Sequence, residues 1–455
     1  MGRAGITGVY LLLNLDAMHL GKHDLKNRND LSRLKPSPPK KNIFRLLGPG
    51  LITGASDDDP SGVATYSQAG ASLGYAMLWT MVVSFPLMAA VQRISGVIGR
   101  VTGHGIAGNM RRSCPGWLTI TCITLMVVAN LINIGADISA MGAAVQLLIG
   151  GPPLVYATVL CVASLLLQVF IPYTQYVKFL KWLTLVLFSY VGTVFVVRVP
   201  WIEALKNTFV PTLSFNAEFF TVLAAIFGTT ISPYLLFWQS SQEVEEVRIV
   251  KAARPLIEAP EQAAVQLNRI EIDTYIGMGV SNVVAFFIIL TTAVTLHAHG
   301  RTDIQTASQA AEALRPVAGR FAFLLFSLGI IGTGLLALPV LAGSAAYAIA
   351  EGLGWKTGLE LKPARAKFFY GVLVVVMLLG FLLNFIHVDP IKALFWSAVV
   401  NGLVAPPIMV VMMRLANDRG VMKSFVISKW LSGMGWLATA VMFLVAALSV
   451  VTWLK

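Results

Sequence analysis

Long apolar runs recur along the whole chain and restrict it to one class of fold. Each run is long enough to cross the hydrocarbon core of a bilayer, which takes about 20 apolar residues in a helix. Of the 455 residues, 56% are hydrophobic and 12% are charged, whereas soluble domains carry about 25% charged residues. In a bilayer every backbone polar group needs a partner within the protein, and a helix satisfies this requirement within one segment. We therefore predict an all-α integral membrane protein.

Eleven spans are predicted, and polar loops separate most of them. Their approximate bounds are 44–72, 76–99, 117–148, 152–172, 178–199, 217–242, 271–296, 318–351, 366–386, 389–414 and 430–453. A basic segment, residues 1–43, precedes the transmembrane domain, residues 44–453. Within that domain we expect a first repeat at about 44–199, a second at about 217–414 and an extra helix at about 430–453.

The basic residues indicate how the chain is oriented. Most of the 34 Lys and Arg fall in residues 1–43 and in the loops that follow even-numbered spans. Cytoplasmic loops carry such an excess, so we expect a cytoplasmic N-terminus and an external C-terminus in the plasma (inner) membrane. The net charge of +12 then reflects topology, and no nucleic-acid partner is expected. The loop at 243–269 is predicted to hold a short cytoplasmic helix, with its acidic run (Glu243, Glu245, Glu246) facing solvent.

The first span contains three consecutive aspartates at 57–59, followed by Pro60. An isolated aspartate at the centre of a span costs roughly 2.5–3.5 kcal/mol, so the group needs water, a cation or protein dipoles beside it. Pro60 lacks an N–H and disfavours helix at the preceding residue, while Gly62 tolerates non-helical backbone. We predict that the helix breaks here and frees carbonyl groups near Ser56 and Gly62.

A second interruption lies in span six, where Pro233 follows several hydroxyl side chains. Two broken spans, five apart, are typical of inverted five-helix repeats that bind a ligand near the midplane of the membrane. Carboxylates, hydroxyls and freed carbonyls are hard oxygen ligands, which suit Mg²⁺, Ca²⁺ or Mn²⁺. The predicted metal ligands are Asp59, Asp58, Ser56, Gly62, Thr229, Thr230 and Ser232.

Further polar residues lie inside the spans. Asn130, Asn133 and Asp137 share one helical face of span three, where they either line a pathway or form hydrogen bonds between helices. Asn401 in span ten is a candidate ligand or gate. The predicted pathway or coupling residues are Asp57, Asn130, Asn133, Asp137, Tyr234 and Asn401.

These features resemble the NRAMP family of divalent-metal transporters, which have the LeuT fold. The resemblance covers nearly all of residues 44–453 and rests on Gly48-Pro-Gly50, Asp59-Pro60 followed by a glycine, Gln68-Ala-Gly70 and the proline of span six. It implies a LeuT-like fold of 11 transmembrane helices, with two inverted five-helix repeats and broken helices 1 and 6. It also implies that Asp59 is the metal-binding aspartate.

The sequence departs from the family pattern at three positions. The family has Asp-Pro-Gly-Asn in span one and Met-Pro-His in span six; its Asn falls on Gly62, its Met on Ser232 and its His on Tyr234. In the family the Met favours transition metals and the His lies on the proton route. Their absence here is similar to the NRAMP-related magnesium transporters, and it implies a wider and more hydrated site.

We therefore expect a secondary transporter that imports Mg²⁺, and also Mn²⁺, by alternating access. The ion is then the transported substrate, and no resident cofactor is expected. The alternative is proton-coupled Mn²⁺ or Fe²⁺ uptake of the ordinary NRAMP type, with Asp137 an open candidate for coupling. The sequence contains neither His-Glu-x-x-His nor Gly-x-Ser-x-Gly, so we do not expect an enzyme. The expected partners are the divalent ion and the lipid bilayer, and no oligomeric state follows from the sequence.

Overall fold

The computed structural model describes residues 53–454, apart from 55, 173–184, 251 and 387. The basic segment 1–43, most of the first half of span one and the start of span five lie outside these residues. Within the described part of the chain, all regular secondary structure is helical. This agrees with the predicted all-α membrane class.

Among the described residues, nine segments are long and apolar enough to cross a bilayer. They correspond to predicted spans two to four and six to eleven: α4 (Trp79–Thr102), α6 (Gly116–Ile149), α7 (Pro153–Phe170), the interrupted pair α11 (Ala217–Thr230) and α12 (Pro233–Ile249), α13 (Ala263–Thr295), α16 (Ala322–Leu353), α17 (Lys367–Leu382), α18 (Pro390–Asn417) and α20 (Lys429–Trp453). The described parts of spans one and five are α3 (Pro60–Leu73) and η3 (Leu185–Leu187) with α9 (Phe188–Val196).

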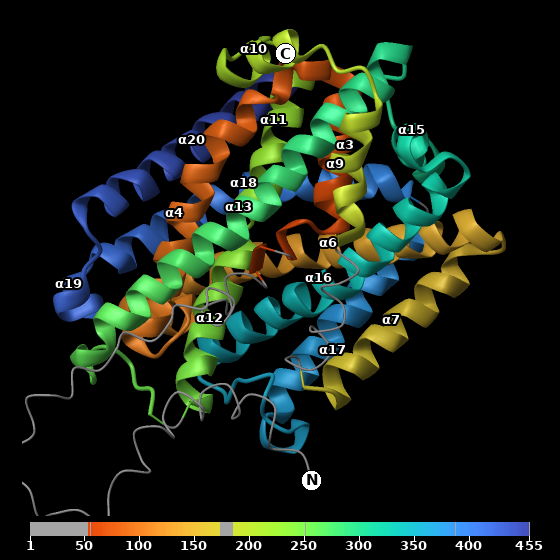
Figure 1. The fold of residues 1–455 in the computed structure, drawn as a ribbon. Coiled ribbons are helices and arrows are strands. Elements are labelled where there is room, and N and C mark those ends of the chain that lie inside the picture. The colour runs from red at the N-terminus through yellow and green to blue at the C-terminus, as the bar shows by residue number, and fades with distance from the viewer. Residues whose placement is uncertain (1–52, 55, 173–184, 251, 387, 455) are drawn as a thin grey trace, which may run out of the picture.

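Short helices and 3₁₀ turns connect the spans. Figure 1 shows α10 and α15 at the upper end of the bundle and α19 toward the other end. The short α-helices are α5 (Ile106–Ser113), α10 (Trp201–Phe209), α14 (Ala307–Ala311), α15 (Arg315–Ala318) and α19 (Arg419–Met422). The 3₁₀ turns are η2 (Gly74–Met77), η4 (Pro260–Gln262), η5 (His297–His299), η6 (Glu312–Leu314), η7 (Gly319–Phe321), η8 (Pro363–Arg365), η9 (Leu383–Ile386) and η10 (Lys423–Phe425).

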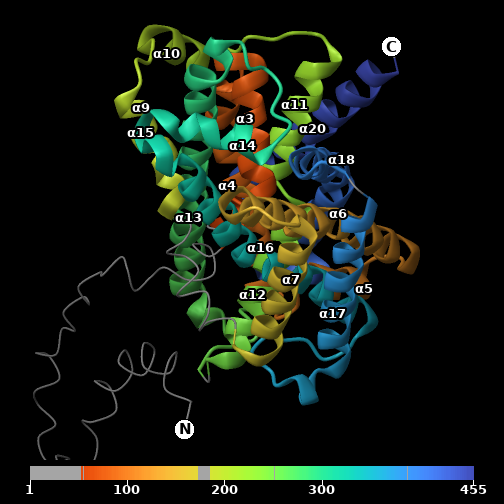
Figure 2. The same cartoon turned by 90° about the vertical axis from the view of Figure 1, so that its right-hand side faces the viewer.

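The two broken spans lie side by side in the middle of the bundle. α3 packs against α13 and α11, whereas α12 packs against α4. The broken helix of each half therefore contacts the second span of the other half, as two inverted repeats require. Figures 1 and 2 show these helices between a flank that contains α4 and α20 and an opposite flank formed by α7 and α17.

Glycines let the backbones of the broken span approach their neighbours closely. A Cβ added at Gly228, near the end of α11, would collide with the carbonyl oxygen of Ala398 in α18. In the same way, Gly99 of α4 lies directly against the backbone of Ser240 in α12. Small residues at such crossings favour tight packing of membrane helices. They fix the two halves of span six against different neighbours.

The acidic run of span six is buried, so its predicted exposure to solvent is wrong. α12 continues through this run to Ile249, and the predicted long loop is reduced to residues 250–262. Glu243 is 0% exposed and forms an ion pair with Arg269 of α13. Glu246 lies 3.1 Å from the same guanidinium group. The prediction failed because composition shows a charge but not the partner that a neighbouring helix supplies to it.

α12 also forms hydrogen bonds with α16. The buried carboxylate of Glu245 accepts hydrogen bonds from the Tyr347 hydroxyl and, at 2.8 Å, from the backbone N–H of Glu360. Glu351 of α16 accepts a hydrogen bond of 3.3 Å from the Ser241 hydroxyl of α12. Buried carboxylates persist in proteins where donors or cations satisfy them, so these contacts hold α12 against α13 and α16.

The packing of Gly99 predicts that Gly99→Ala destabilises the protein. The added methyl group would meet the Ser240 carbonyl, and overpacking of this kind costs about 1–3 kcal/mol. The thermal midpoint of the purified protein should fall by several degrees. Gly371→Ala in α17 is the matched control, because nothing lies within 4 Å of a Cβ there; an equal change in both variants would contradict the packing argument.

Candidate metal site

Asp59 lies at the break of span one, and its side chain is 1% exposed. Its Oδ1 accepts hydrogen bonds of 2.7 Å from the Gly62 N–H and of 2.7 Å from the Ser61 hydroxyl, so the carboxylate caps α3. Its Oδ2 accepts hydrogen bonds from the Asn133 amide at 2.9 Å and from the Tyr234 hydroxyl at 3.3 Å. Four donors on α3, α6 and α12 thus surround one buried carboxylate.

The break of span six, at residues 231–232, faces the break of span one. The Tyr234 hydroxyl, in the first turn of α12, lies 3.4 Å from the carbonyl oxygen of Ser56. On the other side of this break, the Thr229 hydroxyl would lie 3.1 Å from a Cβ at Gly62. The structure therefore brings the predicted residues Ser56, Gly62 and Thr229 together with Asp59.

Two other predicted ligands use their hydroxyl protons within span six. Thr230 donates to the carbonyl of Ile226 at 3.0 Å. Ser232 lies within donating distance of two carbonyls, those of Gly228 at 2.9 Å and Thr229 at 2.7 Å. Such bonds to preceding carbonyls are common for Ser and Thr in helices. These two side chains therefore satisfy the broken backbone of span six, and only their lone pairs remain for a ligand.

Asp57 and Asp58 turn toward α13 and do not share the donors of Asp59. The hydroxyl of Ser281 in α13 lies 2.6 Å from Asp57 Oδ2 and 3.0 Å from Asp58 Oδ1. The exposed fractions of the two aspartates are 0% and 5%. The structure thus separates Asp58, predicted as a ligand, from Asp59 and groups it with Asp57.

The polar face of span three divides between two neighbours. Asn133 donates to Asp59, and its own carbonyl oxygen accepts a hydrogen bond of 2.7 Å from the Ser397 hydroxyl of α18. Asn130 instead donates to Ser344 of α16 at 2.9 Å, away from the breaks. Asn133 therefore belongs to the site, whereas Asn130 forms a hydrogen bond between helices.

Two predicted pathway residues are buried without a hydrogen-bond partner among the described residues. This holds for both carboxylate oxygens of Asp137, a residue that is 0% exposed. It also holds for the amide oxygen and nitrogen of Asn401, which is 1% exposed. Buried polar atoms of this kind are rare in proteins and call for a partner such as water, an ion or a proton. Asp137 lies one helical turn beyond Asn133 on the same face of α6.

Sequence analysis missed Ser281 and Ser397, the two serines that hold site residues from spans seven and ten. Both are buried polar residues within apolar spans. Ser397 also lies one turn before Asn401 on the same face of its helix. Those two signals could have identified them, although serine is common enough in membrane helices that neither is specific.

The site offers a cation few charged ligands. Within the described residues, no three His, Cys, Asp or Glu side chains are arranged to hold a metal ion. The carboxylate of Asp59 lies among carbonyl and hydroxyl oxygens, which are hard ligands.

A cavity of about 370 Å³ lies between α3, α11, α18 and α20. Its lining combines Gln68, Glu218 and Lys392 with aromatic and aliphatic side chains. A small apolar cluster of Ala225, Ala398 and Val399 adjoins it through Phe395. This cluster belongs to the same contact between α11 and α18 that positions the break of span six.

Comparison with known proteins now places the chain in a family. Residues 50–452 match the Nramp family, described as natural resistance-associated macrophage protein-like. The chain belongs to the Nramp family. It is 25% identical over 410 residues to the divalent metal cation transporter MntH of Pectobacterium carotovorum, an alignment that covers 87% of this chain and 91% of that protein.

Solved structures agree on the fold. A manganese transporter of Eremococcus coleocola superposes with a TM-score of 0.69 at 18% identity, covering 94% of this chain and 90% of that chain. MhsT, crystallised with L-phenylalanine, superposes with a TM-score of 0.57 at 13% identity, covering 89% of this chain and 97% of its own. The family resemblance and the LeuT-like fold inferred from the sequence are both confirmed.

The shared role of Ser281 predicts that Ser281→Ala lowers stability. The substitution removes the one hydroxyl proton that two buried carboxylates share, and a buried acceptor left unsatisfied costs about 1–3 kcal/mol or more. Ser344→Ala is a matched control, since Ser344 is equally buried. Its neighbour Asn130 would still donate a hydrogen bond of 2.8 Å to the Leu341 carbonyl. Thermal unfolding of both variants should show the larger loss for Ser281→Ala, and equal losses would contradict this account.

Proposed function

We propose that this Nramp family member is a secondary transporter that imports divalent metal cations by alternating access, with Mg²⁺ as its main substrate and Mn²⁺ as a second. The observation that carries this proposal is the position of Asp59. Its buried carboxylate lies at the junction of two broken helices, beside the Ser56 carbonyl and the Thr229 hydroxyl. The MntH relative is likewise a divalent metal cation transporter.

The preference for Mg²⁺ rests on the ligand types around the two breaks. The NRAMP pattern has a soft methionine sulfur at the position of Ser232, whose hydroxyl here bonds to backbone carbonyls. Hard oxygen ligands favour Mg²⁺ and Mn²⁺ over softer ions. Mg²⁺ gives up its water reluctantly, and Gly62 and Ser232 are smaller than the Asn and Met of the family pattern, so less side-chain volume competes with a hydrated ion.

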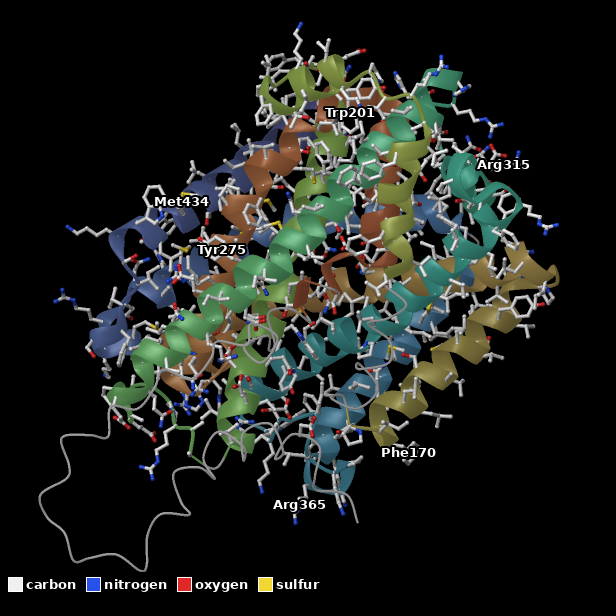
Figure 3. All side chains as sticks on the ribbon, in the orientation of Figure 1. Phe170, Trp201, Tyr275, Arg315, Arg365 and Met434 are labelled. Atoms are coloured by element: carbon white, nitrogen blue, oxygen red, sulfur yellow. The ribbon has the colours of Figure 1, made fainter. Side chains whose placement is uncertain are left out.

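We place the transporter in the plasma (inner) membrane with its N-terminus in the cytoplasm and its C-terminus outside. In this orientation the loops with most basic residues face the cytoplasm. Figure 3 shows Arg365, in one of these loops, at the opposite end of the bundle from Trp201. Exposed apolar side chains such as Phe170 and Val159 cover the flank of α7, as contact with lipid requires.

A second candidate function is proton-coupled uptake of Mn²⁺ or Fe²⁺. Two observations favour it: the relative of known structure is a manganese transporter, and Asp137 is a buried carboxylate without a hydrogen-bond partner in the described structure. A carboxylate in this environment is suited to carry a proton. In this case Asp137 would couple proton entry to release of the metal from Asp59.

Ion flux into proteoliposomes, recorded together with internal pH, distinguishes the two functions. We expect Mg²⁺ uptake without acidification, because Tyr234 takes the place of the family's His at the second break. Asp59→Ala should abolish this uptake in folded protein, whereas Asp303→Ala in an exposed loop should not. Mn²⁺ uptake with acidification and no Mg²⁺ flux would instead establish the second function. Uptake retained by Asp59→Ala would rule out the proposed site.

Selectivity is expected to respond to Ser232→Met. A sulfur ligand at this position should raise Mn²⁺ or Cd²⁺ transport relative to Mg²⁺ by roughly tenfold, the equivalent of one moderate ligand contact of about 1.4 kcal/mol. Competition between the ions in the same liposomes measures the ratio. An unchanged ratio in a well-folded variant would show that Ser232 does not set ion preference.

A further inference from the structure

The acceptor capacity of Asp59 is full in this structure. An ionised carboxylate has about four lone-pair sites, and Asp59 accepts hydrogen bonds from Gly62, Ser61, Asn133 and Tyr234. Asp59 is also buried, so bulk water does not add or remove donors freely. A cation that binds Asp59 directly must therefore displace one of these four donors.

Three of the four donors are fixed in place. The Gly62 N–H and the Ser61 hydroxyl belong to the first turn of α3, which Asp59 itself caps. The Asn133 amide is held by Ser397, whose hydroxyl lies 2.7 Å from the amide oxygen. Turning this amide over would point its oxygen at the Asp59 carboxylate, which is electrostatically unfavourable. The Gly62 N–H and the Asn133 amide therefore do not leave Asp59 without breaking a second interaction, and the Ser61 hydroxyl is held by a short hydrogen bond of 2.7 Å.

The fourth donor, Tyr234, is held least firmly. Its hydroxyl lies 3.3 Å from Asp59 Oδ2 and 3.4 Å from the Ser56 carbonyl oxygen, whereas the other three donors lie 2.7–2.9 Å from Asp59. A hydroxyl has one proton, so it satisfies these two acceptors only in turn. Both are oxygens that a hard cation would bind, and the phenol hydroxyl is within hydrogen-bonding reach of both. A cation that bound these two oxygens would therefore compete with the hydroxyl for them.

We propose that Tyr234 is a specificity-determining residue whose hydroxyl competes with the metal ion for Asp59 and Ser56. This inference rests on the proposed function and concerns its selectivity. An ion that keeps its water replaces the phenol O–H by a water O–H, so Asp59 loses no hydrogen bond. An ion that sheds its water and contacts Asp59 directly supplies no water O–H in place of the phenol O–H. Competition by Tyr234 thus favours ions that stay hydrated, of which Mg²⁺ is the strongest case.

Tyr234→Phe tests this role, because it removes the hydroxyl and keeps the ring. With the competitor gone, apparent Mn²⁺ affinity should rise roughly tenfold, as expected for loss of a hydrogen bond of about 1.4 kcal/mol to a charged group. Mg²⁺ affinity should rise much less, since Mg²⁺ keeps its water and gains little when direct contact with Asp59 becomes possible. Calorimetric titration of the purified full chain with MnCl₂ and MgCl₂ measures both, and uptake in proteoliposomes gives the matching KM values.

The control is Tyr190→Phe in α9, which removes the hydroxyl of an equally buried tyrosine outside the site. It should leave both affinities unchanged. Weaker binding of both ions by Tyr234→Phe would overturn the proposal and make the phenol oxygen a ligand. Unchanged binding would also overturn it. Absence of Mg²⁺ and Mn²⁺ binding by the unaltered chain would overturn the proposed function itself, so the two failures are distinguishable.

Ser397→Ala provides a second test if Tyr234→Phe does not fold. Without Ser397 the Asn133 amide becomes a second exchangeable donor, and Mn²⁺ affinity should again rise relative to Mg²⁺. Ser344→Ala, which leaves the amide bonded to Asp59 untouched, should not change this ratio. A fall in the Mn²⁺ to Mg²⁺ ratio for Ser397→Ala would contradict the fixed-donor argument.

Discussion

The structure depends on how the buried carboxylate of Asp59 is stabilised inside a membrane. Asp59 is buried within a bundle whose flanks face lipid, where an unsatisfied charge is severely destabilising. Its four donors come from the N-terminus of α3, from span three and from α12, the second half of span six. The Gly62 N–H is free to reach Asp59 because span one breaks there, and the Tyr234 hydroxyl reaches it because the break of span six faces that of span one. The breaks, the inverted repeats and the crossing of α11 with α18 at Gly228 all serve this one arrangement.

Sequence reasoning identified the centre of the site because proline and charge are explicit in the residues. Pro60 and Pro233 each begin a helix, and the aspartate immediately before Pro60 is the one that caps it. The fold class followed from span length, and the family from the motifs around these prolines. In both cases local chemistry determines the structure, so no knowledge of neighbouring helices was needed.

Directions of side chains were not predictable in the same way. Nothing in the run 57–59 shows that two aspartates turn to Ser281 while the third turns to α6 and α12. Asn130 and Asn133 share a face, yet a small difference in angle sends one to α16 and the other to Asp59. The buried ion pair of Glu243 with Arg269 could likewise not be predicted from the sequence, since packing between helices brings the two residues together. Tertiary contacts decide these cases, and a single sequence does not contain them.

The contacts that hold α12 against α13 and α16 limit how these helices can move. Separating α12 from α13 would leave the charges of Glu243 and Arg269 apart in a medium of low dielectric constant, where breaking a buried pair costs about 3–5 kcal/mol. Separating it from α16 would in addition remove the Tyr347 hydroxyl from Glu245 and the Ser241 hydroxyl from Glu351. Any rearrangement that preserves these contacts moves α12, α13 and α16 as a single rigid body. The hinge for such a movement then falls at residues 231–232, where α11 ends and α12 begins.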